Sequence, residues 1–114
     1  PNNAGSYCNR GMCRYELDDD KGTIDDCTKA IEIDPNNAVS YYYRGLSKYG
    51  LKDIKGSIDD YTKAIEIDPN DADFYYNRAV ANEDLNKVKD SQDDFKKSAE
   101  LGNKFAESYI EEDS

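Results

Sequence analysis

The sequence predicts an all-α fold, a stacked array of antiparallel helix pairs of the kind called an α-solenoid. Three observations lead to this prediction. The thirteen residues IDDCTKAIEIDPN, from Ile24 to Asn36, return as IDDYTKAIEIDPN from Ile58 to Asn70, 34 residues later and with one difference. Apolar residues recur in register around these segments. A unit of this length that ends on Asp-Pro is typical of helix-turn-helix repeats, which bury their apolar faces only against neighbouring units.

Three units follow one another, over residues 4–37, 38–71 and 72–105. Asn3, Asn37 and Asp71 precede the first helix of each unit, where a side-chain oxygen can accept a hydrogen bond from an amide of the first turn. We expect helices over residues 4–17 and 23–33, 38–51 and 57–67, and 72–85 and 91–101. Pro35 and Pro69 should end the second helix of their units, because proline cannot continue a helix.

The third unit ends on Leu101-Gly102-Asn103 in place of Asp-Pro-Asn. Gly102 suits the left-handed conformation that often follows the last residue of a helix. Residues 104–112 then form an amphipathic segment, in which Phe105, Ala106, Tyr109 and Ile110 are apolar. We expect a capping helix here that covers the exposed face of the last unit.

The first residues, Pro1-Asn2-Asn3-Ala4, repeat the turn Pro35-Asn36-Asn37-Ala38 that closes a unit. From this match we expect the chain to be part of a longer protein, with at least one more unit upstream.

The composition indicates a folded array with a thin core. Of the 114 residues, 35% are charged, and the mean hydropathy is -1.00, values that would ordinarily indicate disorder. The ten tyrosines argue against disorder, because their rings count as polar on hydropathy scales and can nevertheless be buried. We therefore expect one cooperative unit with a modest core.

The charge balance is acidic, with 25 Asp and Glu against 15 Lys and Arg and a net charge of -10. Such a surface repels phosphate backbones and anionic lipid headgroups, so we expect neither nucleic-acid binding nor direct membrane binding. A basic partner would be attracted, and salt would weaken that attraction. A second interpretation is that the charge only keeps a repeat protein soluble.

Nothing in the sequence indicates an enzyme, a cofactor or a metal site. There is no histidine, no glycine-rich phosphate loop and no nucleophile beside a base. The paired aspartates are neighbours on a helix and point about 100° apart, which does not suit an acid–base pair. Cys8, Cys13 and Cys27 lack a CxxC spacing and are expected to be reduced thiols. Residues 18–22, DDDKG, are expected to form a solvated turn.

The repeated positions resemble the tetratricopeptide repeat, whose pattern contains W-x2-L-G-x2-Y, then A-x3-F, then P. In the first helix of each unit, the aromatic place is taken by Tyr7, Tyr41 and Tyr75, and the small place is taken by Gly11, Gly45 and Ala79. In the second helix, the bulky place is taken by Cys27, Tyr61 and Phe95, and the second small place is taken by Ala30, Ala64 and Ser98. The closing proline is Pro35 or Pro69. The resemblance covers essentially the whole chain. It implies a single domain, residues 1–114, built as a right-handed superhelix of antiparallel helix pairs.

One departure from the family pattern occurs in every unit. The leucine before the small residue is replaced by Arg10, Arg44 and Arg78. A charge at a half-buried place needs a partner. Aspartate pairs recur at the same offset on the second helices, as Asp25-Asp26, Asp59-Asp60 and Asp93-Asp94. We expect each arginine to reach an aspartate of its own or an adjacent unit, with Asp26, Asp60 and Asp94 as the expected partners. We interpret these ion pairs as structural, fixing the register of each helix pair.

In arrays of this family the first helix of each unit lines a concave groove, and the resemblance implies the same here. Helical periodicity places on that face Cys8, Asn9, Met12, Tyr15 and Glu16 in the first unit, Val39, Tyr42, Tyr43, Leu46 and Tyr49 in the second, and Asp73, Tyr76, Asn77, Val80, Glu83 and Asp84 in the third. The face carries carboxylates and tyrosines but neither lysine nor arginine, which favours a segment bearing Lys or Arg.

The residues expected to contact a partner are Asn9, Met12, Tyr42, Tyr43, Leu46, Tyr76, Asn77, Val80 and Glu83. We favour packing for Tyr15 and Tyr49. We favour binding for Tyr42, Tyr43 and Tyr76, because Tyr41 and Tyr75 already fill the core place beside them.

The expected function is a scaffold for protein–protein interaction that binds a peptide or partner segment, neutral to basic, in this groove. Two alternatives stay open: self-association through the ends of the array, and a passive spacer between other domains. The best-known mode of the family is a clamp of lysine, arginine and asparagine that grips acidic C-terminal tails of chaperones. Its places fall here on Cys8, Met12, Tyr43, Asp73 and Asn77. Only Asn77 suits such a clamp, so we expect no binding of chaperone tails.

Overall fold

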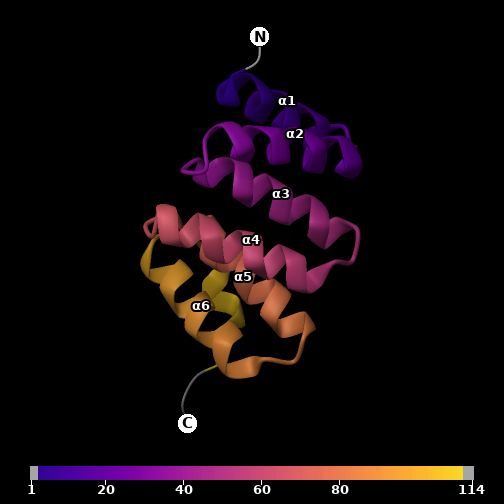
Figure 1. Ribbon diagram of the computed structural model, residues 1–114. Helices are drawn as coiled ribbons and strands as arrows, with labels where there is room; N and C mark the ends of the chain where they lie inside the picture. The colour runs from indigo at the N-terminus through magenta and orange to yellow at the C-terminus, as the bar shows by residue number, and fades with distance from the viewer. Residues whose placement is uncertain (1–2, 112–114) are drawn as a thin grey trace.

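The computed structural model of the protein describes residues 3–111, in which six α-helices are stacked in chain order (Figure 1). The helices are α1 (Ala4–Glu16), α2 (Asp20–Ile33), α3 (Ala38–Gly50), α4 (Ile54–Ile67), α5 (Ala72–Asp84) and α6 (Val88–Glu100), followed by a short 3-10 helix η1 (Ala106–Tyr109). The stack is elongated, with extents of 55 × 25 × 20 Å. None of its helices combines the length and apolar character needed to cross a membrane.

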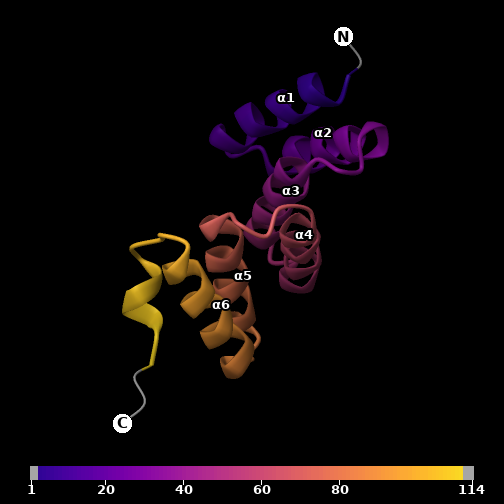
Figure 2. The ribbon, with the colours of Figure 1, turned by 90° about the vertical axis from the view of Figure 1, so that its left-hand side faces the viewer.

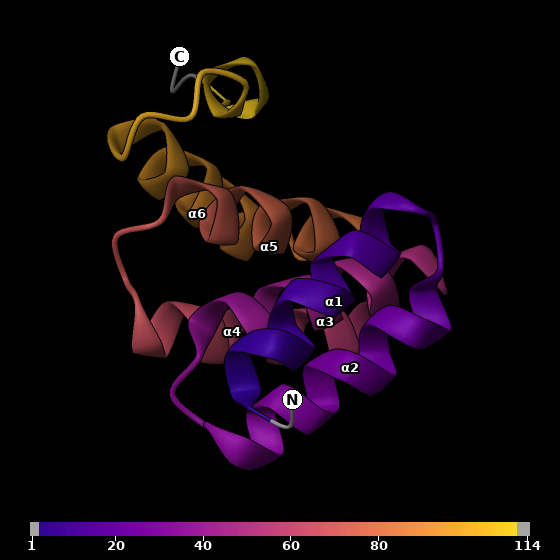
Figure 3. The ribbon, with the colours of Figure 1, turned by 90° about the horizontal axis from the view of Figure 1, so that it is seen from above.

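The helices pack as three pairs, α1 with α2, α3 with α4 and α5 with α6, and each pair also packs on the next through α2–α3 and α4–α5. The first helices of successive pairs touch as well, α1 against α3 and α3 against α5, whereas the second helices lie further apart. The stack therefore curves with α1, α3 and α5 on its inner side. Figure 2 shows this curve, and Figure 3 shows the last pair and η1 displaced from α1 and α2.

The starts of the first helices agree with the prediction from sequence. Asn3, Asn37 and Asp71 cap α1, α3 and α5, and each side chain accepts a hydrogen bond from a backbone amide of the first turn. The ends of α2 and α4 at Ile33 and Ile67 also agree, because Asp34 and Asp68 are extended, the conformation that a following proline imposes.

The second helices begin three residues earlier than predicted, at Asp20, Ile54 and Val88. In the first two pairs an aspartate caps the helix: Asp19 accepts the Gly22 amide at 2.9 Å, and Asp53 accepts the Gly56 amide at 3.0 Å. The chain reverses just before these caps through a single residue in the left-handed conformation, which is Asp18 (φ 61°), Lys52 (φ 71°) or Asn86 (φ 60°). The connection between the two helices of each pair is therefore shorter than the run of polar residues in the sequence indicates.

The core of each pair is built from one bulky side chain of the second helix and one small residue of the first. Cys27, Tyr61 and Phe95 are fully buried, and the opposing small residues Gly11, Gly45 and Ala79 are buried as well. A Cβ at Gly45 would lie 2.7 Å from Cε1 of Tyr61, too close for ordinary contact. The absence of a side chain at Gly45 thus lets α3 approach α4 over the tyrosine ring.

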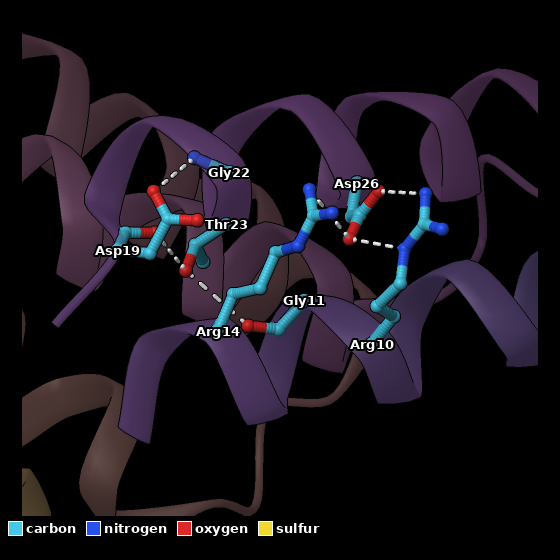
Figure 4. Close-up of polar contacts among 7 residues, drawn as sticks. All are labelled: Arg10, Gly11, Arg14, Asp19, Gly22, Thr23 and Asp26. Carbon is cyan, nitrogen blue, oxygen red and sulfur yellow. Dashed lines mark hydrogen bonds and ion pairs between the residues drawn. The ribbon is translucent and has the colours of Figure 1, made fainter. Parts of the chain in front are cut away.

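An arginine–aspartate ion pair also joins the two helices of every pair. The pairs are Arg10–Asp26, Arg44–Asp60 and Arg78–Asp94, each made by two hydrogen bonds of 2.7–2.9 Å. Each guanidinium lies over the tyrosine three residues before it, 5.5–5.8 Å from the ring centroid. The aspartates are buried, and a further polar side chain of the first helix reaches each carboxylate: Arg14, Lys48 or Asn82. Figure 4 shows Asp26 between Arg10 and Arg14.

The ion pairs differ in their surroundings. Arg44 and Arg78 each donate a further hydrogen bond of 3.2 Å to a threonine of the preceding pair, Thr28 and Thr62 respectively. No helix precedes α1 in the described chain, and the Arg10 side chain is 56% exposed, against 18% for Arg44 and 22% for Arg78.

The segment after α6 differs from the predicted capping helix over residues 104–112. It is a four-residue 3-10 helix, Ala106–Tyr109, and Glu112 lies outside the described residues. Ala106 is buried with Ala79 and Phe95, and Tyr109 stacks on the Phe95 ring with centroids 4.9 Å apart. The segment therefore covers the last pair, but with a single tight turn.

Phe105, expected to pack on the array, is 72% exposed. The reason lies in the turn that precedes η1. The left-handed Gly102 (φ 111°), which the sequence predicts, ends α6, and Asn103 Oδ1 then accepts the amides of Phe105 and Ala106. This turn places Ala106, and not Phe105, against the core.

Candidate functional site

The inner face carries a continuous chain of aromatic rings that links α1, α3 and α5. Tyr15 and Tyr43 meet edge to face with centroids 5.5 Å apart, and Tyr43 meets Tyr42 in the same way at 5.5 Å. Tyr42 in turn lies 4.8 Å from Phe74 and 5.9 Å from the buried Tyr61. These contacts hold the three inner helices together and give the face a defined shape.

Tyr42 and Tyr76, for which we favoured binding, are packing residues to a large degree. Tyr42 lies against Phe74 of the next pair, and its hydroxyl accepts a hydrogen bond of 2.8 Å from Asn77. Tyr76 meets both Phe95 and Tyr109 edge to face, with ring centroids 5.8 and 6.1 Å apart. Tyr41 and Tyr75 fill the core place of their own units, but the rings of Tyr42 and Tyr76 are covered by the element that follows their own unit.

Tyr15 and Tyr49, for which we favoured packing, line an open pocket on this face. The pocket has a volume of about 470 Å³ and is lined by Tyr15, Glu16, Asp18, Asp20, Leu46, Tyr49, Gly50 and Asn77. We call it the Tyr15–Tyr49 pocket. It lies where the C-terminal ends of α1 and α3 meet the start of α2, and α5 contributes Asn77. Its volume is within the range of about 300–1,000 Å³ found for ligand sites.

A difference between successive units accounts for the opening at this place. Tyr15 and Tyr49 occupy the same position in the first and second units. The residue 35 positions after Tyr15 is Gly50, and the residue 35 positions after Tyr49 is Asp84. Asp84 accepts a short hydrogen bond of 2.5 Å from the Tyr49 hydroxyl. Gly50 has no side chain to offer Tyr15, and the Asp20 carboxylate lies close to it: a Cβ at Gly50 would be 2.8 Å from Asp20 Oδ2.

The charged groups that act on the tyrosines of the inner face are acidic. Burial, followed by the charges of Asp20, Glu16 and Asp18, raises the pKa of Tyr15 above its ordinary value. Burial and then the charge of Glu16 raise the pKa of Tyr43. The hydrogen bond to Asp84, together with burial, raises the pKa of Tyr49 to about 12. All three phenols are therefore neutral at physiological pH, and the carboxylates that contribute to each shift would attract a cation.

The remaining residues expected in the groove are spread over different environments. Asn9 and Glu83 are exposed, while Met12, Tyr43 and Leu46 are half-buried on the inner face. Val80 packs against the cluster of Ala79, Phe95 and Ala106 beneath the C-terminal segment. Asn77 Nδ2 is engaged by Tyr42 and by the carbonyl of Asp73, at 2.8 and 3.0 Å.

The places of the family's acidic-tail clamp offer no cation. Cys8 is buried, Met12 and Tyr43 are neutral, and the exposed Asp73 accepts a hydrogen bond of 3.2 Å from Asn103.

Three pocket residues were missed by reasoning from sequence: Asp18, Asp20 and Gly50. The sequence predicts a solvated turn for residues 18–22, and its helical pattern alone does not distinguish Gly50. One signal in the sequence points to Gly50: the other two units have an acidic residue, Glu16 or Asp84, at the same position. The early start of α2 at Asp20, which brings these carboxylates to the inner face, was not available from the pattern.

Comparisons with known proteins identify the repeat directly. Residues 4–37 match the family profile described as tetratricopeptide repeat, and residues 47–86 match a second profile described as TPR repeat. No curated protein matches the chain significantly.

Several solved structures share the fold. The first TPR of Spaghetti (RPAP3), bound to the HSP90 peptide SRMEEVD, superposes with a TM-score of 0.89 at 23% identity, over 94% of this chain and 86% of that chain. The Arabidopsis OM64 TPR domain gives 0.89 at 26% identity, over 93% and 89%. The second TPR domain of human RPAP3, in complex with the HSP70 peptide SGPTIEEVD, gives 0.87 at 25% identity, over 94% and 91%.

Proposed function

The chain belongs to the tetratricopeptide-repeat family, and on that premise we propose that its inner face binds an extended, neutral to basic segment of a partner protein. The fold is typically a non-enzymatic interaction module, and similar domains are found with bound peptides. Because one fold can serve many partners, the character of the partner has to be argued from the residues of the inner face.

The observation that carries the proposal is the Tyr15–Tyr49 pocket. It combines tyrosine rings and Leu46 with three carboxylates, and none of its lining residues is lysine or arginine. Further along the face, Asp73, Glu83 and Asp84 are exposed. A basic segment would be attracted by these charges and would find aromatic and apolar surface on arrival.

The same charges argue against acidic peptides such as those bound by the two RPAP3 domains. A terminal carboxylate placed in a comparable position would meet the exposed Asp73 and would find no cationic side chain among Cys8, Met12 and Tyr43. We therefore propose a partner segment of the opposite charge to those peptides.

The proposal can be tested by titrating fluorescently labelled peptides of equal length and of basic, neutral or acidic composition, at low and high salt. We expect the basic peptide to bind most tightly and salt to weaken its binding, because exposed charges are screened within about 8 Å at physiological ionic strength. The acidic peptide SRMEEVD should not bind. Tight binding of that peptide would overturn the proposal.

A charge-reversal pair locates the binding surface. Glu16→Lys with Glu83→Lys changes the inner face near the C-terminal ends of α1 and α5, where lysine is compatible with the helix dipole. Asp25→Lys with Asp59→Lys makes the same change in net charge at exposed positions of α2 and α4. Binding of the basic peptide should be lost in the first variant and retained in the second. Equal losses would indicate a nonspecific charge effect.

A second candidate function is self-association through the N-terminal end of the array. The observations in its favour come from the first described pair: the Arg10 side chain is 56% exposed and lacks the threonine contact that Arg44 and Arg78 make, and Leu17, which follows α1, is 78% exposed. Sedimentation velocity over a range of concentrations separates the two functions. A mass that rises with concentration and is lowered by Arg10→Glu would support stacking, and a constant monomer would exclude it. A monomer that binds none of the peptides would leave the role of spacer.

A further inference from the structure

The Tyr15–Tyr49 pocket has the features of a receptor for one cationic side chain. We propose that it anchors a single lysine or arginine of the partner segment and thereby fixes the position of that segment along the groove. This inference rests on the function proposed above and specifies how it is achieved.

The walls of the pocket suit the aliphatic part of such a side chain. Leu46 supplies apolar surface, and the rings of Tyr15 and Tyr49 flank the opening from successive units. Tyr15 is held edge to face by Tyr43, and Tyr49 is held by its hydrogen bond to Asp84, so both rings are oriented before a ligand arrives. Within residues 3–111 the Tyr15 hydroxyl makes no hydrogen bond. Aromatic faces attract ammonium and guanidinium groups as well as methylene stems.

The polar end of the pocket lacks a counter-ion. Glu16, Asp18 and Asp20 all line it, and none of them forms an ion pair with another described residue. A bound cation would therefore supply the opposite charge that this end of the pocket lacks. No group of carboxylates among residues 3–111 is arranged to hold a metal ion, which favours an organic cation as the occupant.

The two equivalent places in the described array differ in the residue that stands beside the tyrosine. Between the second and third units the position of Gly50 is taken by Asp84, whose carboxylate accepts the Tyr49 hydroxyl. A groove with one anchoring pocket can bind a basic segment in a single register, whereas a uniformly acidic groove would let the segment slide. The asymmetry between Gly50 and Asp84 is thus the proposed source of specificity.

The pocket can be tested without knowing the partner. The probe is N-acetyl-lysine N-methylamide, and its matched neutral probe is the norleucine analogue, which lacks only the ammonium group. Both are titrated into the intact 15N- and 13C-labelled chain and followed by NMR. We expect the lysine probe to shift the signals of Tyr15, Leu46 and Tyr49 with saturation, and the norleucine probe to shift them at least about threefold more weakly.

Two sets of variants test the assignment. Glu16→Gln, Asp18→Asn and Asp20→Asn together should weaken the lysine probe by about tenfold or more, at roughly two- to fivefold per exposed charge. Asp25→Asn, Glu32→Gln and Asp59→Asn together change the net charge equally at exposed sites outside the pocket and should leave binding unchanged. Tyr15→Leu should weaken binding, whereas Tyr15→Phe, which keeps the ring, should not.

The outcomes separate this inference from the groove function. If basic peptides bind the inner face but the lysine and norleucine probes behave alike, the anchoring pocket is excluded and the groove function stands. If the lysine probe binds at Tyr15 and Tyr49 but peptides bind elsewhere, the pocket stands and the groove function fails. Equal effects of the pocket and control triplets would overturn the pocket by showing that only net charge matters.

Discussion

The first and second units differ in one residue over the thirteen of Ile24–Asn36 and Ile58–Asn70, and yet they place that shared sequence in different surroundings. The ion pairs Arg10–Asp26 and Arg44–Asp60 have almost the same geometry, but the Arg10 side chain is 56% exposed and that of Arg44 is 18% exposed. The pair is made within a unit, and its burial comes from the unit before. Interactions within units and between units are therefore separable in this array, as nearest-neighbour descriptions of repeat proteins assume.

The first and second units also differ in the size of the side chains in their cores. Cys8 and Cys27 of the first unit stand where Tyr42 and Tyr61 stand in the second, and in the second unit the two rings lie 5.9 Å apart. Both positions change together, from two small side chains to two large ones. The first unit therefore has less apolar surface to bury, and we expect it to be the weaker one.

The largest expected effect compares the two core positions directly. Tyr61→Ala should lower the free energy of unfolding by about 4 kcal/mol, because it leaves a cavity at a fully buried site. Cys27→Ala should lower the free energy of unfolding by only about 1 kcal/mol, since it removes a thiol group that is little larger than a methylene group. Urea denaturation followed by circular dichroism measures both. Equal losses would contradict the view that the first unit has the thinner core.

Arg44→Leu should lower the free energy of unfolding by about 3 kcal/mol, because Asp60 is buried and would keep only Lys48 as a cationic partner. Arg10→Leu should have a smaller effect, since Arg10 is largely exposed and Arg14 stays close to Asp26. Urea midpoints give the difference, and NMR chemical shifts report the helix register. If Arg44→Leu leaves both unchanged, the ion pair does not fix the register.

Thr28→Val removes the oxygen that accepts the hydrogen bond from Arg44 and keeps the shape of the side chain. We expect a loss of about 1 kcal/mol, typical of one hydrogen bond. The loss should largely disappear when Arg44 is already leucine, because the contact between the units then no longer exists. Strictly additive effects of the two changes would indicate that Thr28 acts through some other contact.

Tyr49 and Tyr15 provide a comparison based on pH. The pKa of Tyr49 is raised to about 12 by Asp84, whereas Gly50 offers Tyr15 no such acceptor. A raised folded-state pKa stabilises the protein fully below the unfolded value of about 10, and the contribution is lost as the pH rises towards the folded value. The stability advantage of the natural protein over Asp84→Ala should therefore shrink between about pH 10 and 12. Ultraviolet titration of tyrosinate should show Tyr49 ionising earlier in the variant.

The smallest expected effect concerns the turns. Lys52 adopts a left-handed conformation (φ 71°) that is strained for a residue with a side chain. Lys52→Gly should raise the free energy of unfolding by about 0.5 kcal/mol, the relief of strain being partly offset by the flexibility of glycine in the unfolded chain. The corresponding change at Asn86 should gain less, because asparagine tolerates this conformation better. Thermal unfolding of the two variants provides the test, and a loss of stability in Lys52→Gly would contradict it.

Much of the fold could be predicted from the repeat. The period of 34 residues gives the helix pairs, and the caps at Asn3, Asn37 and Asp71 locate the starts of the first helices. The starts of the second helices could not be placed, because Asp19 and Asp53 cap them within a run of polar residues that also resembles a longer turn. The C-terminal segment was predicted as a helix because its apolar pattern does not reveal the tight turn at Asn103.

Less of the candidate site could be predicted. Periodicity identifies the inner helices and the negative charge of their face, but it cannot tell which tyrosines the next element covers. Tyr42 and Tyr76 occupy equivalent positions in the second and third units. Phe74 covers Tyr42, and Tyr109 covers Tyr76. The Tyr15–Tyr49 pocket depends on Asp18 and Asp20, whose positions follow from a single left-handed residue and an early helix start.

The near-identity of α2 and α4 also has a consequence for how the chain folds. During folding α1 meets two almost interchangeable partners, because α4 offers the same aspartate, threonine and alanine in the same order. Pairing with α4 would raise the sequence separation between Arg10 and its aspartate from 16 to 50 residues (60 − 10), roughly threefold, which costs only about 1 kcal/mol of closure entropy. The single difference in the shared segment, Cys27 against Tyr61, must therefore contribute to the choice between partners. We therefore expect pairing of α1 with α4 to compete with the native pairing during folding, which would slow folding and promote exchange of helices between molecules.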